Sequence, residues 1–361
     1  MKKLISVLLC VVLAVSSIGI VTYAKEDFDV TEIIPFSTDY SITADMINPE
    51  LRFIGSLVRA VVPSFNETLF KISNFVLDNL GIGLNLVDGS INFEQIYIER
   101  EDGTQLRLCV YSPKEKKENV PGLLWIHGGG YAIGIPEQDA SFIEAFVLAS
   151  GCVVVAPDYI NSTDAPYPAA LNDCYTSLLW LKDNGAQYGM RDDQIFVGGD
   201  SAGGGLAAAV TLLARDKGEV AIAFQMPLYP MLDDRMITES SQNNDAPIWN
   251  TKSNVCAWKL YLGEDYGTDN VSKYAAPARE TDYTDLPPTL TYVGTIEPFT
   301  DETVEYVENL RNAGVEVQFR MFDGCFHGFD LFSFTDVAQD ARELLIDGFM
   351  YAVNNYTAEQ P

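Results

Sequence analysis

The feature that most constrains the fold of this chain is a regular alternation of short apolar runs with helix-like segments, which starts near residue 91. The apolar runs include residues 122–126, 152–156, 194–198 and 221–226. Buried strands that alternate with helices form a mostly parallel sheet with helices on both faces. We therefore predict an α/β fold for the region from residue 91 to the C-terminus.

The same patterns predict the other elements of this region. They are a hairpin of strands 91–99 and 105–111, helices 170–184, 203–215, 301–312 and 336–353, and strands 289–293 and 315–322. Two segments fall outside the alternation. Residues 25–90 carry helical spacing, and residues 232–275 are polar and irregular around a short predicted helix, 255–262. Since such sheets bind ligands at the carboxyl ends of their strands, both segments are candidates for a cap there.

The N-terminus has the features of a secretory signal peptide. Lys2 and Lys3 precede an apolar run at residues 4–21, and small residues near Ala24 fit a cleavage site. We predict a signal peptide over residues 1–24 and a secreted mature chain. The alternative is an uncleaved membrane anchor, for which the run is long enough.

The net charge of −28 argues against nucleic-acid and anionic membrane partners, because such surfaces repel acidic proteins. Five cysteines follow Ala24, an odd number without a CxxC pair. That count argues against a disulfide framework and against a zinc site. We therefore expect no metal, and the composition leaves the oligomeric state open.

The sequence Gly199-Asp200-Ser201-Ala202-Gly203 follows a predicted strand and begins a predicted helix. A nucleophile held on a sharp strand-to-helix turn needs glycines on either side, and the helix N-terminus directs N–H groups at negative charge. Ser201 is therefore the candidate nucleophile, with Asp200 as a supporting residue and the Ala202 N–H as an oxyanion donor. The alternative is a serine that caps a helix.

A second glycine-rich sequence, His127-Gly128-Gly129-Gly130, directly follows the predicted strand 122–126. Glycines at a strand end can present unobstructed N–H groups to an oxyanion. We predict that the N–H groups of Gly128 and Gly129 form the oxyanion hole, while His127 and Gly130 support the loop. The alternative is a phosphate-binding loop, but the glycine spacing of nucleotide-binding motifs is not met.

The chain contains two histidines, and His327 is the candidate general base. It follows the last predicted strand, and the expected chain order of nucleophile, acid and histidine requires a carboxylate before it. Glu297 lies in the turn after strand 289–293, so we predict it as the acid. Asp301 is the alternative acid, and we predict that it caps the next helix as a supporting residue.

These motifs together resemble those of the hormone-sensitive lipase family of α/β-hydrolases, the carboxylesterases with an HGGG loop. The resemblance covers residues 91–361 and rests on four segments: 127–130, 199–204, 327–329, and Asp158-Tyr159 with the Pro-Tyr-Pro-Ala-Ala of 166–170. It implies an eight-stranded, mostly parallel sheet, a helical cap formed partly by the N-terminal segment, and no cofactor. It also implies a carboxylic ester hydrolase that acts on acyl esters.

Two departures from the family pattern affect the site. Glu297 stands where the family usually has aspartate, which a triad tolerates because either carboxylate can orient the imidazole. Residues 160–165 read Ile-Asn-Ser-Thr-Asp-Ala in place of the usual Arg-Leu-Ala-Pro-Glu. This second change alters the packing expected beside the oxyanion loop.

The sequence thus predicts a secreted serine esterase for short-chain acyl esters of small molecules or carbohydrates, without stable membrane association after signal cleavage. Two alternatives remain: a serine peptidase or amidase on the same fold, and a non-catalytic relative that binds a ligand in the cleft. The presence of the base His327 argues against the second alternative.

Overall fold

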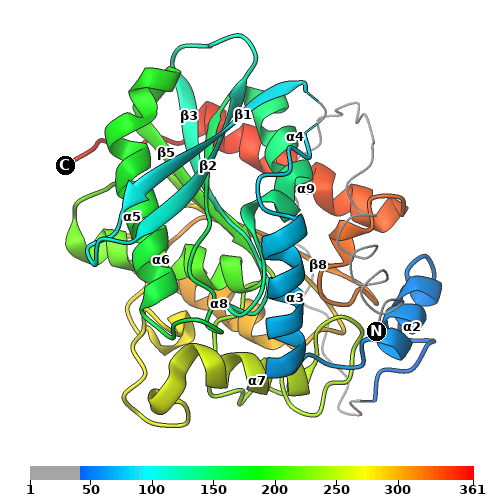
Figure 1. Ribbon diagram of the computed structural model, residues 1–361. Coiled ribbons are helices and arrows are strands. Elements are labelled where there is room, and N and C mark those ends of the chain that lie inside the picture. The colour runs from blue at the N-terminus through cyan, green and yellow to red at the C-terminus, as the bar shows by residue number, and fades with distance from the viewer. Residues whose placement is uncertain (1–40, 88) are drawn as a thin grey trace.

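The computed structural model describes residues 41–87 and 89–361 (Figure 1). The predicted signal peptide, residues 1–24, lies outside the described residues, as does the first part of the predicted cap segment 25–90. In the part of the chain that is described, none of the helices has the length and apolar character needed to cross a membrane.

Eight strands form a single sheet in the order β1-β2-β4-β3-β5-β6-β7-β8. The strands are β1 (Ile91–Glu99), β2 (Gln105–Pro113), β3 (Val120–Ile126), β4 (Val153–Pro157), β5 (Met190–Asp200), β6 (Phe224–Leu228), β7 (Thr289–Gly294) and β8 (Val317–Phe322). Strand β2 pairs antiparallel with β1 and β4, and all other neighbours are parallel. The predicted α/β-hydrolase sheet, eight-stranded and mostly parallel, is confirmed.

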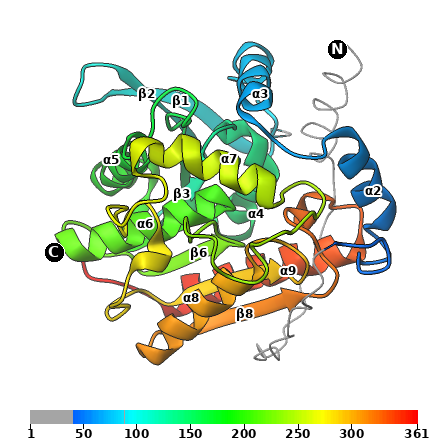
Figure 2. The same cartoon turned by 90° about the horizontal axis from the view of Figure 1, so that it is seen from below.

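Helices cover both faces of this sheet (Figures 1 and 2). Helices α4 (Ala140–Ser150) and α9 (Asp336–Asn355) pack together on one face. The other face carries α5 (Ala169–Asn184), α6 (Ala202–Lys217) and α8 (Thr300–Asn312). Helix α4 is the one of these five that the sequence did not predict. Its residues are apolar on nearly all sides, so they lack the polar face that produces helical spacing.

The two segments outside the alternation contain α2 (Arg52–Val61) and α3 (Glu67–Leu80) in the first, and α7 (Thr251–Leu262) in the second. The two segments are joined by hydrogen bonds. The Asn250 amide donates to the Pro63 carbonyl at 2.7 Å, and the Phe65 N–H donates to Ser253 Oγ at 2.9 Å. The chain between α2 and α3 is therefore attached to the start of α7.

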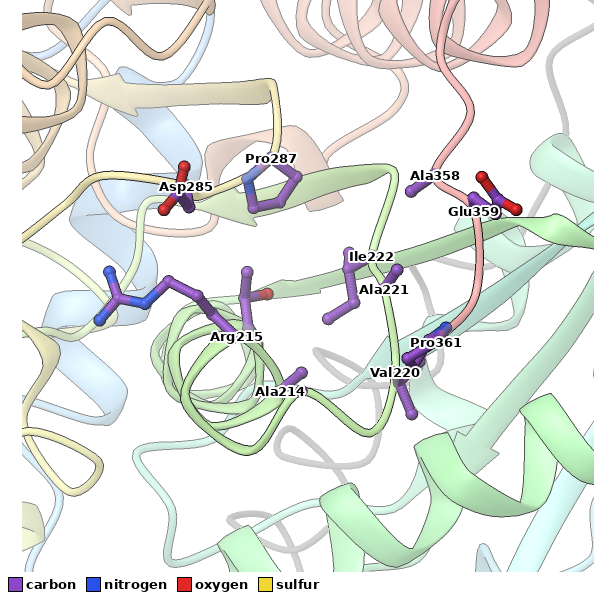
Figure 3. Close-up of a pocket in the computed structure, with 12 residues that line it drawn as sticks. Ala214, Arg215, Val220, Ala221, Ile222, Asp285, Pro287, Ala358, Glu359 and Pro361 are labelled. Carbon is purple, nitrogen blue, oxygen red and sulfur yellow. The ribbon is translucent and has the colours of Figure 1, made fainter.

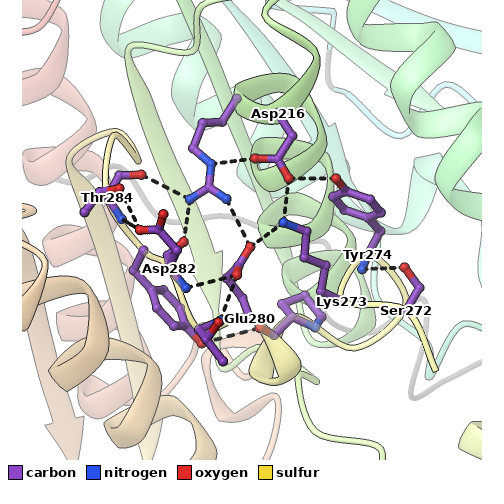
Figure 4. A network of polar contacts seen from close by, with 11 residues as sticks. Asp216, Ser272, Lys273, Tyr274, Glu280, Asp282 and Thr284 are labelled. Atoms are coloured by element: carbon purple, nitrogen blue, oxygen red, sulfur yellow. Dashed lines mark hydrogen bonds and ion pairs between the residues drawn. The ribbon is translucent and has the colours of Figure 1, made fainter. Parts of the chain in front are cut away.

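A polar network fixes the end of the second segment to α6 (Figure 4). Glu280 accepts hydrogen bonds from Arg215 at 3.0 Å and from Lys273 at 2.7 Å, while Lys273 also pairs with Asp216 at 2.6 Å. Glu280 is mostly buried, which raises its pKa, but Lys273 and the N–H groups of Asp282 and Thr281 outweigh burial and hold the pKa below the usual range. The chain is thus anchored before it enters β7.

Candidate active site

Ser201 occupies a strained turn between β5 and α6, with φ 58° and ψ −120°. Its N–H donates to the Leu228 carbonyl at 2.9 Å, which ties the turn to β6. A Cβ atom on Gly199 would lie 2.4 Å from the Ile126 oxygen, and one on Gly203 would lie 2.0 Å from it. The two glycines are therefore required, because any side chain there would collide with the backbone of β3.

His327 connects this serine to a carboxylate. Its Nε2 atom lies 2.7 Å from Ser201 Oγ, and its Nδ1 atom contacts a carboxylate oxygen of Glu297. The other oxygen of Glu297 accepts the Gly294 N–H at 2.9 Å. Because the carboxylate can only accept, Nδ1 carries the proton and Nε2 presents its lone pair to the serine hydroxyl. This is the arrangement that proton transfer from the serine requires.

The three side chains lie away from bulk water. Glu297 is fully buried, and 5% of Ser201 and 4% of His327 are exposed. Tyr229 and Phe299 contact the imidazole edge-on, each at a centroid distance of 5.0 Å. Burial raises the pKa of Glu297, while the facing His327 opposes that rise. The charge of Glu297 thus depends on its histidine partner.

Asp301, the alternative acid, binds a different partner, the backbone of Ser240. It lies in the first turn of α8 and accepts the Ser240 N–H at 2.7 Å. The N-cap position just before α8 is occupied by Phe299, and no side chain caps the helix, so the prediction that Asp301 caps it is wrong. Its carboxylate instead attaches the segment 232–275 to α8, and no bond to His327 is found among the described residues.

The loop that follows β3 differs from the prediction at Gly128. The Gly128 N–H donates to Asp200 Oδ1 at 2.9 Å, so this donor is already engaged and the prediction that it binds an oxyanion is wrong. In the described part of the chain, no hydrogen bond is formed by the N–H of Gly129 or Gly130. The N–H of Ala202 stands at the first position of α6. The free donors of this region are therefore those of Gly129, Gly130 and Ala202.

His127 holds the loop and has no contact with Ser201. Its Nδ1 atom lies 2.8 Å from the Gly128 oxygen, and its ring stacks on Tyr159 with a centroid distance of 4.2 Å. Tyr159 in turn donates its hydroxyl to the His127 carbonyl at 2.9 Å. Burial lowers the pKa of His127 to about 4, so the ring is neutral at physiological pH. These contacts fix the position of the loop that carries the three glycines.

An aromatic wall, which sequence reasoning missed, borders the glycine loop. It consists of Phe65 and Phe70 from the first segment and Trp249 from the second, with centroid distances from 5.3 to 6.2 Å. A Cβ atom on Gly130 would lie 2.2 Å from the Trp249 ring, which is also 6.4 Å from the His327 ring. No local pattern signals this wall, because its members come from two distant segments.

Outside the triad, the described chain contains a cavity but no metal-binding cluster. Residues 41–87 and 89–361 contain no group of three or more His, Cys, Asp or Glu side chains placed to hold a metal ion. A cavity of 330 Å³ lies beside the C-terminal tail (Figure 3). It is lined by Ile222 and Pro287, which precede β6 and β7, so it opens at the amino ends of the strands. Ser201 lies at their carboxyl ends.

Comparison with known proteins places this geometry in a family. Residues 123–331 match the family described as alpha/beta hydrolase fold. Esterase LipI of Mycobacterium tuberculosis is 34% identical over 211 residues, which are 58% of this chain and 66% of that protein. Carboxylesterase NlhH of the same organism is 31% identical over 231 residues, which are 63% and 72% of the two chains. The solved structure "Bacterial Heroin Esterase" has a TM-score of 0.78 and 34% identity, and covers 86% of this chain and 99% of its own.

The chain belongs to the family of proteins with the alpha/beta hydrolase fold, since the match covers more than half of its length. The relatives just described are named as esterases or carboxylesterases. Within that family, the chain is a carboxylesterase of the hormone-sensitive lipase type, and so a carboxylic ester hydrolase.

Proposed function

We propose that this protein is a secreted serine carboxylesterase for short-chain acyl esters, with Ser201 as nucleophile, His327 as general base and Glu297 as the acid that orients the base. The observation that carries the proposal is the continuous contact from Ser201 Oγ through His327 to Glu297, on a turn that holds the serine at φ 58°. Strained backbone of this kind persists where the surrounding structure holds it, and active sites are where it collects.

In the proposed mechanism, His327 Nε2 accepts the Ser201 proton as Oγ attacks the ester carbonyl carbon. The resulting oxyanion accepts hydrogen bonds from the N–H groups of Gly129, Gly130 and Ala202. His327 then donates its proton to the leaving alcohol, and a water molecule repeats the sequence to release the acid. Throughout, the Glu297 carboxylate fixes the histidine tautomer and stabilises the imidazolium.

Replacement of Ser201 by alanine tests the nucleophile. We expect kcat for p-nitrophenyl acetate to fall on the order of 10⁶-fold, to the level of residual binding and oxyanion stabilisation. A fluorophosphonate probe should label the wild-type protein and leave S201A unlabelled, which also separates an enzyme from a non-catalytic binder. Near-normal turnover by S201A would refute the assignment.

The aromatic wall supports a short acyl group. Trp249 fills the space over Gly130 next to His327, so the region beside the proposed oxyanion hole offers little room for a long chain. A series of p-nitrophenyl esters from acetate to octanoate should show the highest kcat/KM for the shortest chains. Acetylated xylan measured beside the series tests carbohydrate esters, and a peptide-amide panel tests the peptidase or amidase alternative.

The proposed secretion is supported by the sequence of residues 1–24, which lie outside the described structure. Expression of the full chain in a secreting host, followed by N-terminal sequencing of the protein in the medium, should give Lys25 as the first residue. Retention of the intact chain in the membrane fraction would support the uncleaved anchor instead.

A further inference from the structure

Two buried carboxyl groups lie in contact behind the nucleophile. Asp200 ends β5, and Asp139 ends the short 3-10 helix Pro136–Asp139 that precedes α4. Only 6% of Asp200 and 2% of Asp139 is exposed, and the two side chains are hydrogen-bonded to each other. Because a carboxylate can only accept hydrogen bonds, this contact requires that one of the two groups carries a proton.

The neighbouring donors leave room for one shared proton between the pair. Trp125 Nε1 donates to Asp139 Oδ2 at 2.9 Å, and the Gly128 N–H donates to Asp200 Oδ1 at 2.9 Å. Burial raises the pKa of both carboxyl groups, and Arg342 lies near Asp139 and favours the charged form of that group. Asp200 is therefore the acid that donates, and Asp139 is the carboxylate that accepts.

No neighbouring cation neutralises the pair directly in the described part of the chain. Arg342 donates to Ser141 Oγ at 2.9 Å and to the Asp330 backbone oxygen at 3.4 Å. The Asp330 carboxylate adds negative charge nearby and accepts the hydroxyls of two tyrosines. The titratable and charged groups that interact with the pair are Tyr111, Tyr159, Tyr229, Tyr292, His327, Asp330 and Arg342.

We infer that Asp200, kept protonated by Asp139, is the positioning residue of the oxyanion loop. As a neutral group it accepts the Gly128 N–H and fixes the loop without placing a negative charge next to the donors of Gly129 and Gly130. Asp139 holds the charge one side chain further away, where Trp125 binds it. The kinetic consequence rests on the proposed function, whereas the protonation of Asp200 does not.

Amide substitutions distinguish the two carboxyl groups. In D200N the introduced amide can accept the Gly128 N–H with its oxygen and donate to Asp139 with its nitrogen, so it reproduces the protonated acid. We expect D200N to keep kcat within about threefold of wild type. D200A, which releases the loop, should lower kcat by about 10²-fold. KM for p-nitrophenyl acetate should change little in either variant.

The D139N variant makes the opposite change. Its amide supplies the donor, so Asp200 becomes the ionised group and the negative charge moves next to the loop. We expect kcat at neutral pH to fall about tenfold or more below that of D200N, because this charge opposes the oxyanion. Equal activity of D200N and D139N, or a D200N as impaired as D200A, would overturn the assignment.

An infrared measurement tests the proton without any substrate. At about pH 8 exposed carboxyl groups are ionised, so a wild-type minus D200N difference spectrum should contain the C=O stretch of a protonated carboxyl. Glu302, a second buried acid whose pKa burial raises well above the usual range, provides the matched control. The E302Q variant should lose its own band and keep that of Asp200. A difference spectrum without such a band would overturn the proposal even if S201A had confirmed the esterase mechanism, and a failed S201A test would leave this result valid.

Discussion

Replacing Glu297 by glutamine tests the proposed role of this residue, because the change keeps the size of the side chain and removes its charge. Two hydrogen bonds decide the outcome, one from the Gly294 N–H and one with His327 Nδ1. An amide has one acceptor and one donor end, so it cannot accept both N–H groups. If its oxygen accepts the Gly294 N–H, its NH₂ faces His327 and favours the tautomer with the proton on Nε2. That tautomer cannot take the serine proton.

The magnitude follows from two contributions. Turning the amide around restores the correct tautomer, but it leaves two buried donors facing each other, at a cost of about 1–3 kcal/mol. In either orientation the imidazolium loses a facing charge, and two unit charges about 4 Å apart are worth about 4 kcal/mol at an effective dielectric constant of 20. Since each 1.36 kcal/mol is a factor of ten in rate, we expect kcat to fall by about 10⁴–10⁵-fold.

The assay is steady-state hydrolysis of p-nitrophenyl acetate, with thermal unfolding to show that the variant is folded. D301N is the matched control, because Asp301 contacts Ser240 and makes no contact with His327. We expect D301N to keep kcat within about threefold of wild type, since an amide oxygen can still accept the Ser240 N–H. If E297Q kept more than about a tenth of wild-type kcat, or if D301N lost more activity than E297Q, the assignment of the acid would be refuted.

Three further predictions concern other parts of the site. The H327A variant should lose kcat on the order of 10⁵-fold, whereas H127A, which disturbs the loop and spares the base, should lose about 10²-fold in the same assay. The W249A variant, which opens the space over Gly130, should raise the ratio of kcat/KM for hexanoate over acetate by about tenfold. An unchanged ratio would show that Trp249 does not limit the length of the acyl chain. Burial raises the pKa of Glu302, so the folded state holds a proton that the unfolded state releases above its ordinary pKa. Stability from that proton is present at low pH and is lost as pH rises, by up to about 1.4 kcal/mol per pH unit, so the Tm of E302Q relative to wild type should increase between about pH 5 and pH 8.

The sheet and the main site residues could be predicted because their signals are local. A strand such as Val120–Ile126 is a continuous apolar run, and the glycines on either side of Ser201 are recognisable as a motif, although the backbone that requires them is that of Ile126 in β3. Glu297 is predictable as the acid because it lies in the turn after β7, at the carboxyl edge of the sheet. In each case the sequence near the residue determines its position, and the topology of a parallel sheet brings the carboxyl ends together.

The errors arose where a partner lies far away in the sequence. Gly128 belongs to the same run of three glycines as Gly129 and Gly130, and what distinguishes it is the Asp200 carboxylate, 72 residues further on. Aspartate is a residue type favoured at helix caps, yet the Asp301 carboxylate accepts the Ser240 N–H from the inserted segment, residues 232–275. A glycine motif therefore shows that a loop can offer N–H groups, but the tertiary structure decides which of them remain free.

This division of the loop explains why its glycines are not interchangeable. The Gly128 N–H is used to hold the loop against Asp200, and the loop can present its next two donors only because this first one is engaged. A Cβ atom on Gly128 would lie 2.5 Å from an Asp200 oxygen, so substitution there should displace the anchor. A Cβ atom on Gly130 would instead collide with the Trp249 ring at 2.2 Å, and should disturb the wall and the acyl preference. The two glycines thus serve one loop through different partners, one from the sheet and one from the inserted segment.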